Sequence, residues 1–118
     1  MQADQIKQLV INALEDLKAQ NLLVLDVKGA TSVTDYMILA SGSSSRQVMA
    51  LARNVQDAIR KEGMEPLSIE GLDAGEWVLV DLGDIIVHVM QPQVREYYDL
   101  EKLWREFSMP TLEPVSDD

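Results

Sequence analysis

A single histidine, three successive serines and an acidic hairpin supply the side chains of this sequence that could do chemistry. His88 could combine with Ser43 and Asp81 in a nucleophilic site, where the histidine would take the hydroxyl proton and the carboxylate would orient the ring. The residues around Ser43 lack the spacing of a nucleophile elbow, so the pattern gives this site little support. The absence of cysteine excludes disulfides, thiolate zinc sites and cysteine nucleophiles.

The stretch SGSSSR, residues 41–46, is a second candidate for chemistry. A glycine and serine turn that leads into a helix can bind phosphate through backbone N–H groups, and this turn is similar to the one in nucleotidyltransferases. Nucleotidyl transfer also needs clustered carboxylates for Mg²⁺, and no alternating acidic pair is present. Capping of the next helix by Ser44 and Gln47 explains the turn more simply. A remnant nucleotidyltransferase that binds nucleotide and Mg²⁺ near Ser43 remains the alternative function.

Four acidic residues around the hairpin could in principle hold a hard cation: Asp73, Glu76, Asp81 and Asp84. Their spacing is not that of a calcium loop. One histidine without any cysteine also disfavours a transition-metal site. We therefore expect no metal and no cofactor, and we interpret these carboxylates as a solvated acidic rim.

Length and charge limit the classes of function. The 118 residues fit one domain, and ten Lys and Arg against 20 Asp and Glu give a formal net charge of −10. Because nucleic-acid binding depends on neutralising phosphates, we expect little direct RNA contact and a basic protein as the better partner, although solubility alone could explain the charge. No signal peptide or membrane-spanning apolar run is evident, so we expect a cytoplasmic protein, or one in an organelle lumen, with no membrane partner.

Hydrophobic periodicity and turn residues predict the elements that position these groups. They are a helix over 4–19, strands over 22–27 and 35–41, a helix from 44 to 63, an edge strand over 67–69, hairpin strands over 76–81 and 84–90, and a helix over 92–107. Asp4 is expected to cap the first helix, and Ser44 and Gln47 to form a capping box for the second. This order predicts a mixed sheet covered by helices, of the α/β or α+β class.

A basic stripe is predicted on the second helix, where Arg46, Arg53 and Arg60 recur every seven residues almost opposite its apolar face. A solvated helix face is the simplest interpretation. Whether these arginines contact anything stays open.

The hairpin GEWVLVDLGDIIVHV, residues 75–89, has an unusual second face. A two-residue loop at Leu82 and Gly83 would place five apolar residues on the core face: Val78, Val80, Ile85, Val87 and Val89. The other face would pair Trp77 with His88, Leu79 with Ile86, and Asp81 with Asp84, with Met90 further along. Amphipathic aromatic groups are frequent at interfaces, and an apolar Leu82 at a turn is unexpected. A second packed core and a docking surface both fit this pattern.

Three blocks of sequence, residues 35–48, 75–90 and 95–104, together resemble the ribosomal silencing factor, or Iojap, family. The resemblance extends over about residues 4–106 in the same order and spacing. The positions that match the family's blocks are Asp35, Tyr36, Ser41, Gly42, Arg46, Gln47, Trp77, Asp81, His88, Arg95, Tyr98, Leu100, Glu101 and Trp104.

The resemblance implies a nucleotidyltransferase-like α/β domain that lacks the catalytic acids, so an enzyme is not expected. We place this domain at residues 1–107 and expect a mobile acidic tail over 108–118. Members of the family bind ribosomal protein fourteen of the large subunit and sterically block joining of the small subunit, which lowers translation when nutrients are scarce. The resemblance thus favours a non-enzymatic binding protein.

The resemblance also favours the second face of the hairpin as the docking surface. Trp77 would be its anchor, with Leu82, His88 and Tyr98 around it, because buried aromatic residues dominate interface energetics. Asp81 and Asp84 would form a charged rim toward the basic ribosomal protein. The same apolar face could instead support a homodimer in the free state.

Overall fold

The computed structural model describes residues 2–107 and 112–114. Four helices and six strands make up this part of the chain. In chain order they are α1 (Ala3–Asp16), β1 (Gln20–Asp26), β2 (Tyr36–Ser41), α2 (Ser45–Lys61), β3 (Ser68–Glu70), β4 (Trp77–Asp81), β5 (Ile85–Met90), α3 (Pro92–Tyr98), α4 (Leu100–Phe107) and β6 (Leu112–Pro114).

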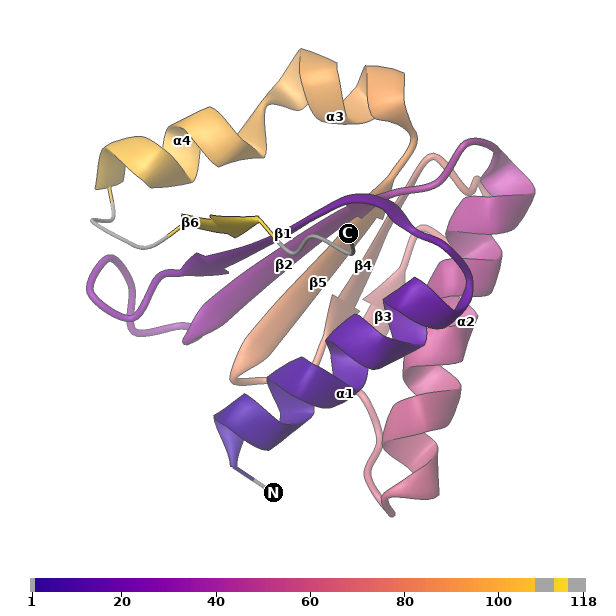
Figure 1. Cartoon of the computed structure of the whole chain (residues 1–118), viewed down its shortest axis with the longest axis horizontal. Helices are drawn as coiled ribbons and strands as arrows, with labels where there is room; N and C mark the ends of the chain where they lie inside the picture. The colour runs from indigo at the N-terminus through magenta and orange to yellow at the C-terminus, as the bar shows by residue number, and fades with distance from the viewer. Residues whose placement is uncertain (1, 108–111, 115–118) are drawn as a thin grey trace.

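The strands form one mixed sheet in the order β3-β4-β5-β2-β1-β6. Strands β2 and β5 are parallel, and the other neighbouring pairs are antiparallel. Helices α1 and α2 lie on one side of the sheet and α3 and α4 on the other (Figure 1). This arrangement confirms the expected fold class of helices packed on a mixed sheet, and β3 is the expected edge strand. The nucleotidyltransferase-like description remains a prediction.

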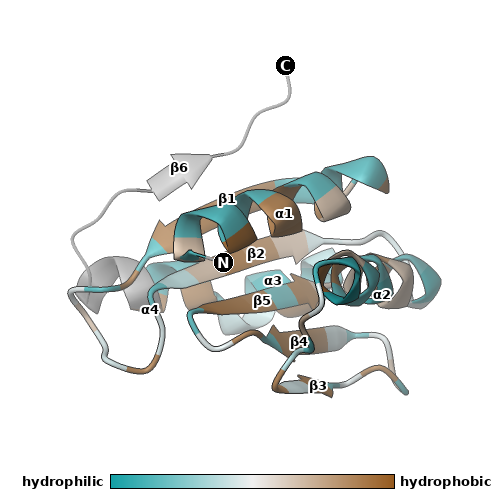
Figure 2. Cartoon of the chain, turned by 90° about the horizontal axis from the view of Figure 1, so that it is seen from below, coloured by the Kyte–Doolittle hydropathy of each residue, from teal (hydrophilic) through white to brown (hydrophobic). Residues whose placement is uncertain are grey.

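The side of the sheet under α1 and α2, which we call the covered face, contains the larger core. Both helices place their apolar residues at three- and four-residue steps, so each presents one apolar stripe to the strands. In Figure 2 the strands behind α1 and α2 are largely apolar, whereas α2 is largely polar outside. The five hairpin residues predicted for this core are all fully buried: Val78, Val80, Ile85, Val87 and Val89.

The predicted helix caps are confirmed in part. The Ser44 hydroxyl accepts a hydrogen bond from the backbone N–H of Gln47 at 3.1 Å, but the Gln47 side chain accepts from the Ser43 N–H at 2.6 Å and not from Ser44. Asp4 as the first cap was wrong, because α1 begins one residue earlier and Gln2 is its cap. Asp4 instead accepts a hydrogen bond from the Tyr36 hydroxyl at 3.0 Å, which ties α1 to β2.

The predicted register of the hairpin was wrong by two residues. Leu82 and Ile85 pair through the Leu82 N–H and the Ile85 carbonyl at 2.9 Å, so Gly83 and Asp84 form the turn. Gly83 has φ +89°, a conformation that glycine adopts without steric cost, and its N–H donates to the Asp81 carboxylate at 2.9 Å. Trp77 is therefore opposite Met90 and not opposite His88. Because side chains alternate with a period of two, the predicted faces of the strands still hold.

The single predicted helix over 92–107 is two helices. Asp99 has left-handed backbone angles, φ 47° and ψ 54°, and separates α3 from α4. In the region expected to be a tail, Leu112–Pro114 form β6 antiparallel to β1, while residues 108–111 and 115–118 lie outside the described residues. The domain boundary at residue 107 stays a prediction.

Candidate protein-docking site

The side of the sheet under α3 and α4 is covered over only part of its width. Val94 of α3 and Leu100 of α4 pack against a second apolar cluster, whose buried members are Leu23, Leu25, Val27, Met37, Leu39 and Met90. These residues lie on β1 and directly after it, on β2 and at the end of β5. The two short helices therefore cover the β1–β2 half of this side.

Toward β4 the burial of this side decreases along each row of side chains. Leu39 on β2 is fully buried, His88 beside it on β5 is 4% exposed, and Leu79 beside that on β4 is partly exposed. The neighbouring rows show the same gradient: Ser41, Met90 and Trp77, and Met37, Ile86 and Asp81. The β4 edge of this side is thus accessible.

We call the accessible part the open face. It consists of the partly or fully exposed side chains on this side of β3, β4 and β5: Ser68, Glu70, Trp77, Leu79, Asp81 and Ile86. The pairing of β3 with β4 places Glu70 beside Leu79, so Glu70 adds a carboxylate that the sequence prediction missed. Alternation along β3 was the signal that could have found it.

Trp77 and His88 form the central pair of this site. The indole Nε1–H of Trp77 donates to Nδ1 of His88 at 3.0 Å. Because the indole nitrogen can only donate, Nδ1 must be the acceptor and the neutral imidazole carries its hydrogen on Nε2. Burial lowers the pKa of His88 from 6.5 to about 4, so the ring is neutral at pH 7.

The Nε2 atom of His88 is buried and has no hydrogen-bond partner among the described residues. The directly paired neighbours of His88 on β4 and β2 are Leu79 and Leu39, which offer no polar side-chain atom. A buried donor without a partner costs about 1–3 kcal/mol. A buried donor of this kind calls for an acceptor that the described residues do not supply.

Two tyrosines extend the aromatic surface outward from Trp77. The ring of Tyr98 lies 4.9 Å from that of Trp77 between centroids, and Tyr97 meets Tyr98 edge-on at the same distance. Tyr97 and Tyr98 are 81% and 54% exposed. An aromatic patch therefore continues from the open face onto α3.

Gly71 fixes the backbone at the start of β4. It has φ +92°, and a Cβ atom built on it would lie 2.1 Å from the carbonyl oxygen of Trp77. Only glycine allows this approach of the loop before β4 to the strand. The contact therefore fixes the position of the backbone at Trp77.

The structure does not bring all six predicted docking residues together. Trp77, His88 and Tyr98 are in contact, but His88 lies beneath the surface. Leu82 packs on the covered face, because the corrected turn makes it the last paired residue of its strand. The expectation that it surrounds Trp77 was therefore wrong. Asp81 is four residues along β4 from Trp77, about 13 Å away, and the exposed Asp84 lies beyond it in the turn.

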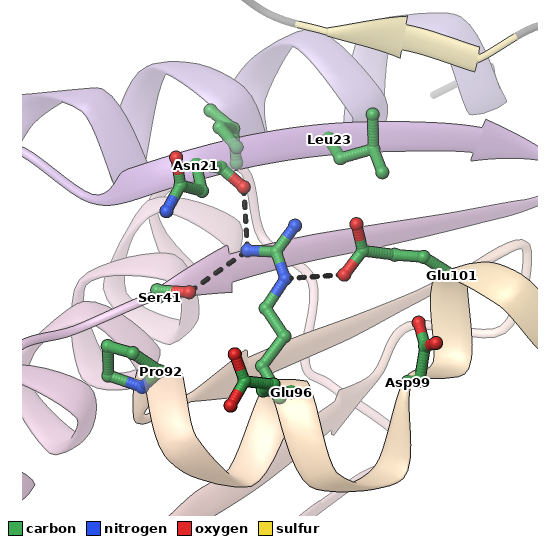
Figure 3. A pocket seen from close by; sticks show the side chains of 9 residues that line it. Asn21, Leu23, Ser41, Pro92, Glu96, Asp99 and Glu101 are labelled. Carbon is green, nitrogen blue, oxygen red and sulfur yellow. Dashed lines mark hydrogen bonds and ion pairs between the residues drawn. The ribbon is translucent and has the colours of Figure 1, made fainter.

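Arg95 joins α3 to the sheet, and its partners Asn21, Ser41 and Glu101 are labelled in Figure 3. Its Nε donates to Glu101 of α4 at 2.8 Å, and its Nη1 donates to the Asn21 carbonyl at 2.6 Å and to the Ser41 hydroxyl at 3.0 Å. Asn21 has φ 50° at an irregularity of β1. Arg95 lines a cavity of about 560 Å³, and its side chain is 10% exposed. This network joins both C-terminal helices to β1 and β2.

The other chemical candidates gain no support. Ser43 and Ser44 are engaged with Gln47 at the start of α2, and the Nδ1 of His88 is engaged with Trp77. Among the described residues, no group of three His, Cys, Asp or Glu side chains could hold a metal ion. No helix in that part of the chain is long and apolar enough to cross a membrane.

Comparisons with known proteins agree in pointing to the ribosome. The family model described as "Ribosomal silencing factor during starvation" matches residues 1–118. A ribosomal silencing factor of Chromobacterium violaceum is 49% identical over 104 residues, which are 88% of this chain and 85% of that protein. A crystal structure of a C. violaceum protein, 44% identical, covers 100% of this chain and 98% of its own, with a TM-score of 0.87.

A more distant relative occurs in the mouse, Mus musculus. This protein is named "Mitochondrial assembly of ribosomal large subunit protein 1" and is 34% identical over 99 residues, which are 81% of this chain and 43% of the mouse protein. None of these names indicates a catalytic activity.

Proposed function

This chain belongs to the ribosomal silencing factor family, and we propose that it silences translation by binding ribosomal protein fourteen of the large subunit and keeping the small subunit from joining. Membership of the family implies association with the large ribosomal subunit. The mechanism proposed is occlusion in the cytoplasm under nutrient limitation. It needs a docking surface and no chemical step.

The observation that carries this proposal is the open face. It combines a partly exposed Trp77 with the exposed Tyr97 and Tyr98 and with apolar side chains at Leu79 and Ile86. Aromatic residues in such patches contribute most of the binding energy of protein interfaces, and a truncation at the anchor often costs about 2 kcal/mol or more. Because His88 is buried, only a partner group that reaches beneath this surface could contact it.

The negative charges on and beside the open face favour a basic partner. Glu70 and Asp81 lie on the face itself, and Asp84 is exposed in the adjoining turn. With a net charge of −10, the whole chain favours encounter with a basic protein surface. A basic ribosomal protein fits this pattern better than RNA, whose phosphates the rim would repel.

Subunit association tests the proposal directly. Purified large and small subunits are mixed with excess protein, and their joining is followed by light scattering or sedimentation. Wild type should suppress joining, and Trp77→Ala should restore it by weakening docking about 30-fold or more, the equivalent of about 2 kcal/mol. Leu17→Ala is the matched control, because Leu17 is a 40% exposed apolar residue that follows α1 on the opposite side of the sheet.

Unimpeded joining with excess wild type would refute the occlusion mechanism. Equal loss in the Trp77→Ala and Leu17→Ala variants would refute the open face as the docking surface. A homodimer is the competing use of the same face, and size exclusion of wild type against Trp77→Ala would reveal it as a larger species that the substitution dissociates.

A further inference from the structure

We propose that the buried Nε2–H of His88 is a specificity donor, which forms a hydrogen bond with an uncharged oxygen acceptor of the docked partner. The inference rests on the proposed function, since it assigns a chemical role to one atom beneath the open face. It names what the partner must insert at this point: a carbonyl or hydroxyl oxygen.

The first support is the fixed direction of the donor. Trp77 occupies Nδ1 at 3.0 Å, so Nε2 must carry the hydrogen. Nε2 is the ring nitrogen farther from the backbone, and the His88 side chain stands on the α3 side of the sheet. The Nε2–H group therefore lies on the same side of the sheet as Leu79 and the open face.

The second support is the lack of any internal acceptor. Among the described residues no group accepts from Nε2, although the residue is only 4% exposed. Buried polar groups are satisfied in most proteins, and those that are not call for a role. A partner that supplies the acceptor recovers the cost of the lone donor, which makes binding depend on that acceptor.

The third support is that the residues beside His88 on the β4 side are themselves partly exposed. Leu79 is directly opposite His88, and Trp77 is its hydrogen-bond partner, and both are partly exposed. Tyr98, which contacts Trp77, is 54% exposed. The residues beside His88 on β4 are thus themselves in contact with solvent, on the side where the partner is proposed to dock.

The charge of the surroundings indicates which acceptor fits. Glu70 and Asp81 flank Leu79 on the open face and would repel a carboxylate or phosphate. A lysine or arginine side chain has no acceptor to offer. An uncharged oxygen, flanked by basic residues that meet the rim, satisfies both the donor and the carboxylates.

Three substitutions at position 88 separate this role from positioning of Trp77. In His88→Gln the amide nitrogen comes close to the place of Nε2, but no acceptor remains near the place of Nδ1. In His88→Asn the amide oxygen comes close to the place of Nδ1 and can accept from Trp77, but no donor reaches the place of Nε2. His88→Phe keeps the ring shape and removes both functions.

The measurement is equilibrium binding of each labelled protein to purified large ribosomal subunits at pH 7. We expect His88→Asn and His88→Phe to bind about tenfold more weakly than wild type, the value of one hydrogen bond, and His88→Gln to stay within about threefold. The opposite order, with Asn retained and Gln lost, would show that His88 acts only by holding Trp77. Wild-type affinity in all three variants would exclude contact at Nε2.

Unfolding in urea provides the second measurement, because a buried substitution can simply disturb the fold. His88→Phe removes a donor that has no partner, but it also removes the acceptor of the Trp77 Nε1–H, so its stability at pH 7 should stay within about 1 kcal/mol of wild type while it binds more weakly. A parallel loss of stability and affinity would overturn the proposal.

Nitrogen-15 NMR of the histidine ring in the free protein should show hydrogen on Nε2 only, and addition of isolated ribosomal protein fourteen should shift that hydrogen downfield. An unchanged Nε2 signal, as expected if a retained water already accepts from it, contradicts the inference. If wild type fails to bind large subunits at all, the proposed function falls together with this inference. Binding of wild type with the wrong order of variants removes this inference alone.

Discussion

The two sides of the β4–β5 hairpin differ in burial, and this difference separates a stabilising core from the proposed docking surface. On the covered face five apolar residues of β4 and β5 are fully buried beneath helices of 14 and 17 residues. On the other side the helices have 7 and 8 residues, and burial falls from β2 to β4. The same two strands thus carry a complete core on one side and a partly covered surface on the other.

The distribution of buried polar groups sharpens this contrast. Among the described residues they are Thr34, Ser41, His88 and Arg95, and the last three lie on the side of α3 and α4. Polar groups inside a core cost stability unless they are paired, so a purely structural face has little use for them. The side proposed to bind is therefore also the side that contains most of these buried polar groups.

Replacement of Arg95 should have the largest effect on stability, because its side chain joins α3 and α4 to β1 and β2. Arg95→Met leaves Glu101 and the Asn21 carbonyl without their shared partner, and breaking a buried ion pair from one side costs about 3–5 kcal/mol. Urea unfolding should show this loss. Arg53→Met, at an exposed position of α2, is the control and should change stability by less than about 0.5 kcal/mol. A loss below about 1 kcal/mol for Arg95→Met would mean that the cover is held by apolar contacts instead.

Acid should have the next largest effect, and the part that His88 contributes comes from the partly covered side. His88 has a pKa of about 4 in the folded protein and 6.5 when unfolded, so between these values the unfolded chain binds more protons. Stability should therefore fall by about 3 kcal/mol as the pH drops from 6.5 to 4, and change no further through this group below pH 4. Carboxylates titrate in the same range, so the measured quantity is the free energy of unfolding of wild type minus that of His88→Phe. The idea fails if the two proteins have the same slope against pH.

Val80 and Leu79, neighbours on β4 that face opposite sides of the sheet, should show the smallest effects on stability but the most direct comparison of the two faces. Val80→Ala on the covered face should cost about 2 kcal/mol of stability, because it empties a fully buried site. Leu79→Ala on the open face should cost about 1 kcal/mol or less, since that side chain is partly in water, yet should weaken binding to large subunits several-fold. Equal effects on stability at the two positions would remove the distinction between the faces.

Local patterns predicted the faces of the hairpin but not its register. Alternation assigns a side chain to a face, and a shift of two residues leaves that assignment intact, so nothing in the strands themselves revealed the error. The information lay in the turn, where Gly83 takes the positive φ and moves Leu82 into the strand pair. Ser44 and Gly63 marked the limits of α2 correctly, because both act through their immediate neighbours.

Features that depend on distant contacts were not predictable. The break at Asp99 interrupts a stretch that has continuous helical spacing, and the Arg95 network reaches back 74 residues to Asn21. The burial of His88 likewise follows from its place beside Leu39 on β2, which no local pattern encodes. Trp77 was proposed from the amphipathic pattern of the hairpin and Tyr98 from the resemblance to the family, and Glu70 was missed because β3 has only three residues.

The close approach of Gly71 to the Trp77 carbonyl has a consequence for genetics. A methyl group added at Gly71 would collide with the Trp77 carbonyl, so it would displace the backbone that carries the proposed anchor. A screen for translation-derepressed alleles would return position 71 beside position 77, and loss of function at a position is therefore no sign that the ribosome touches it.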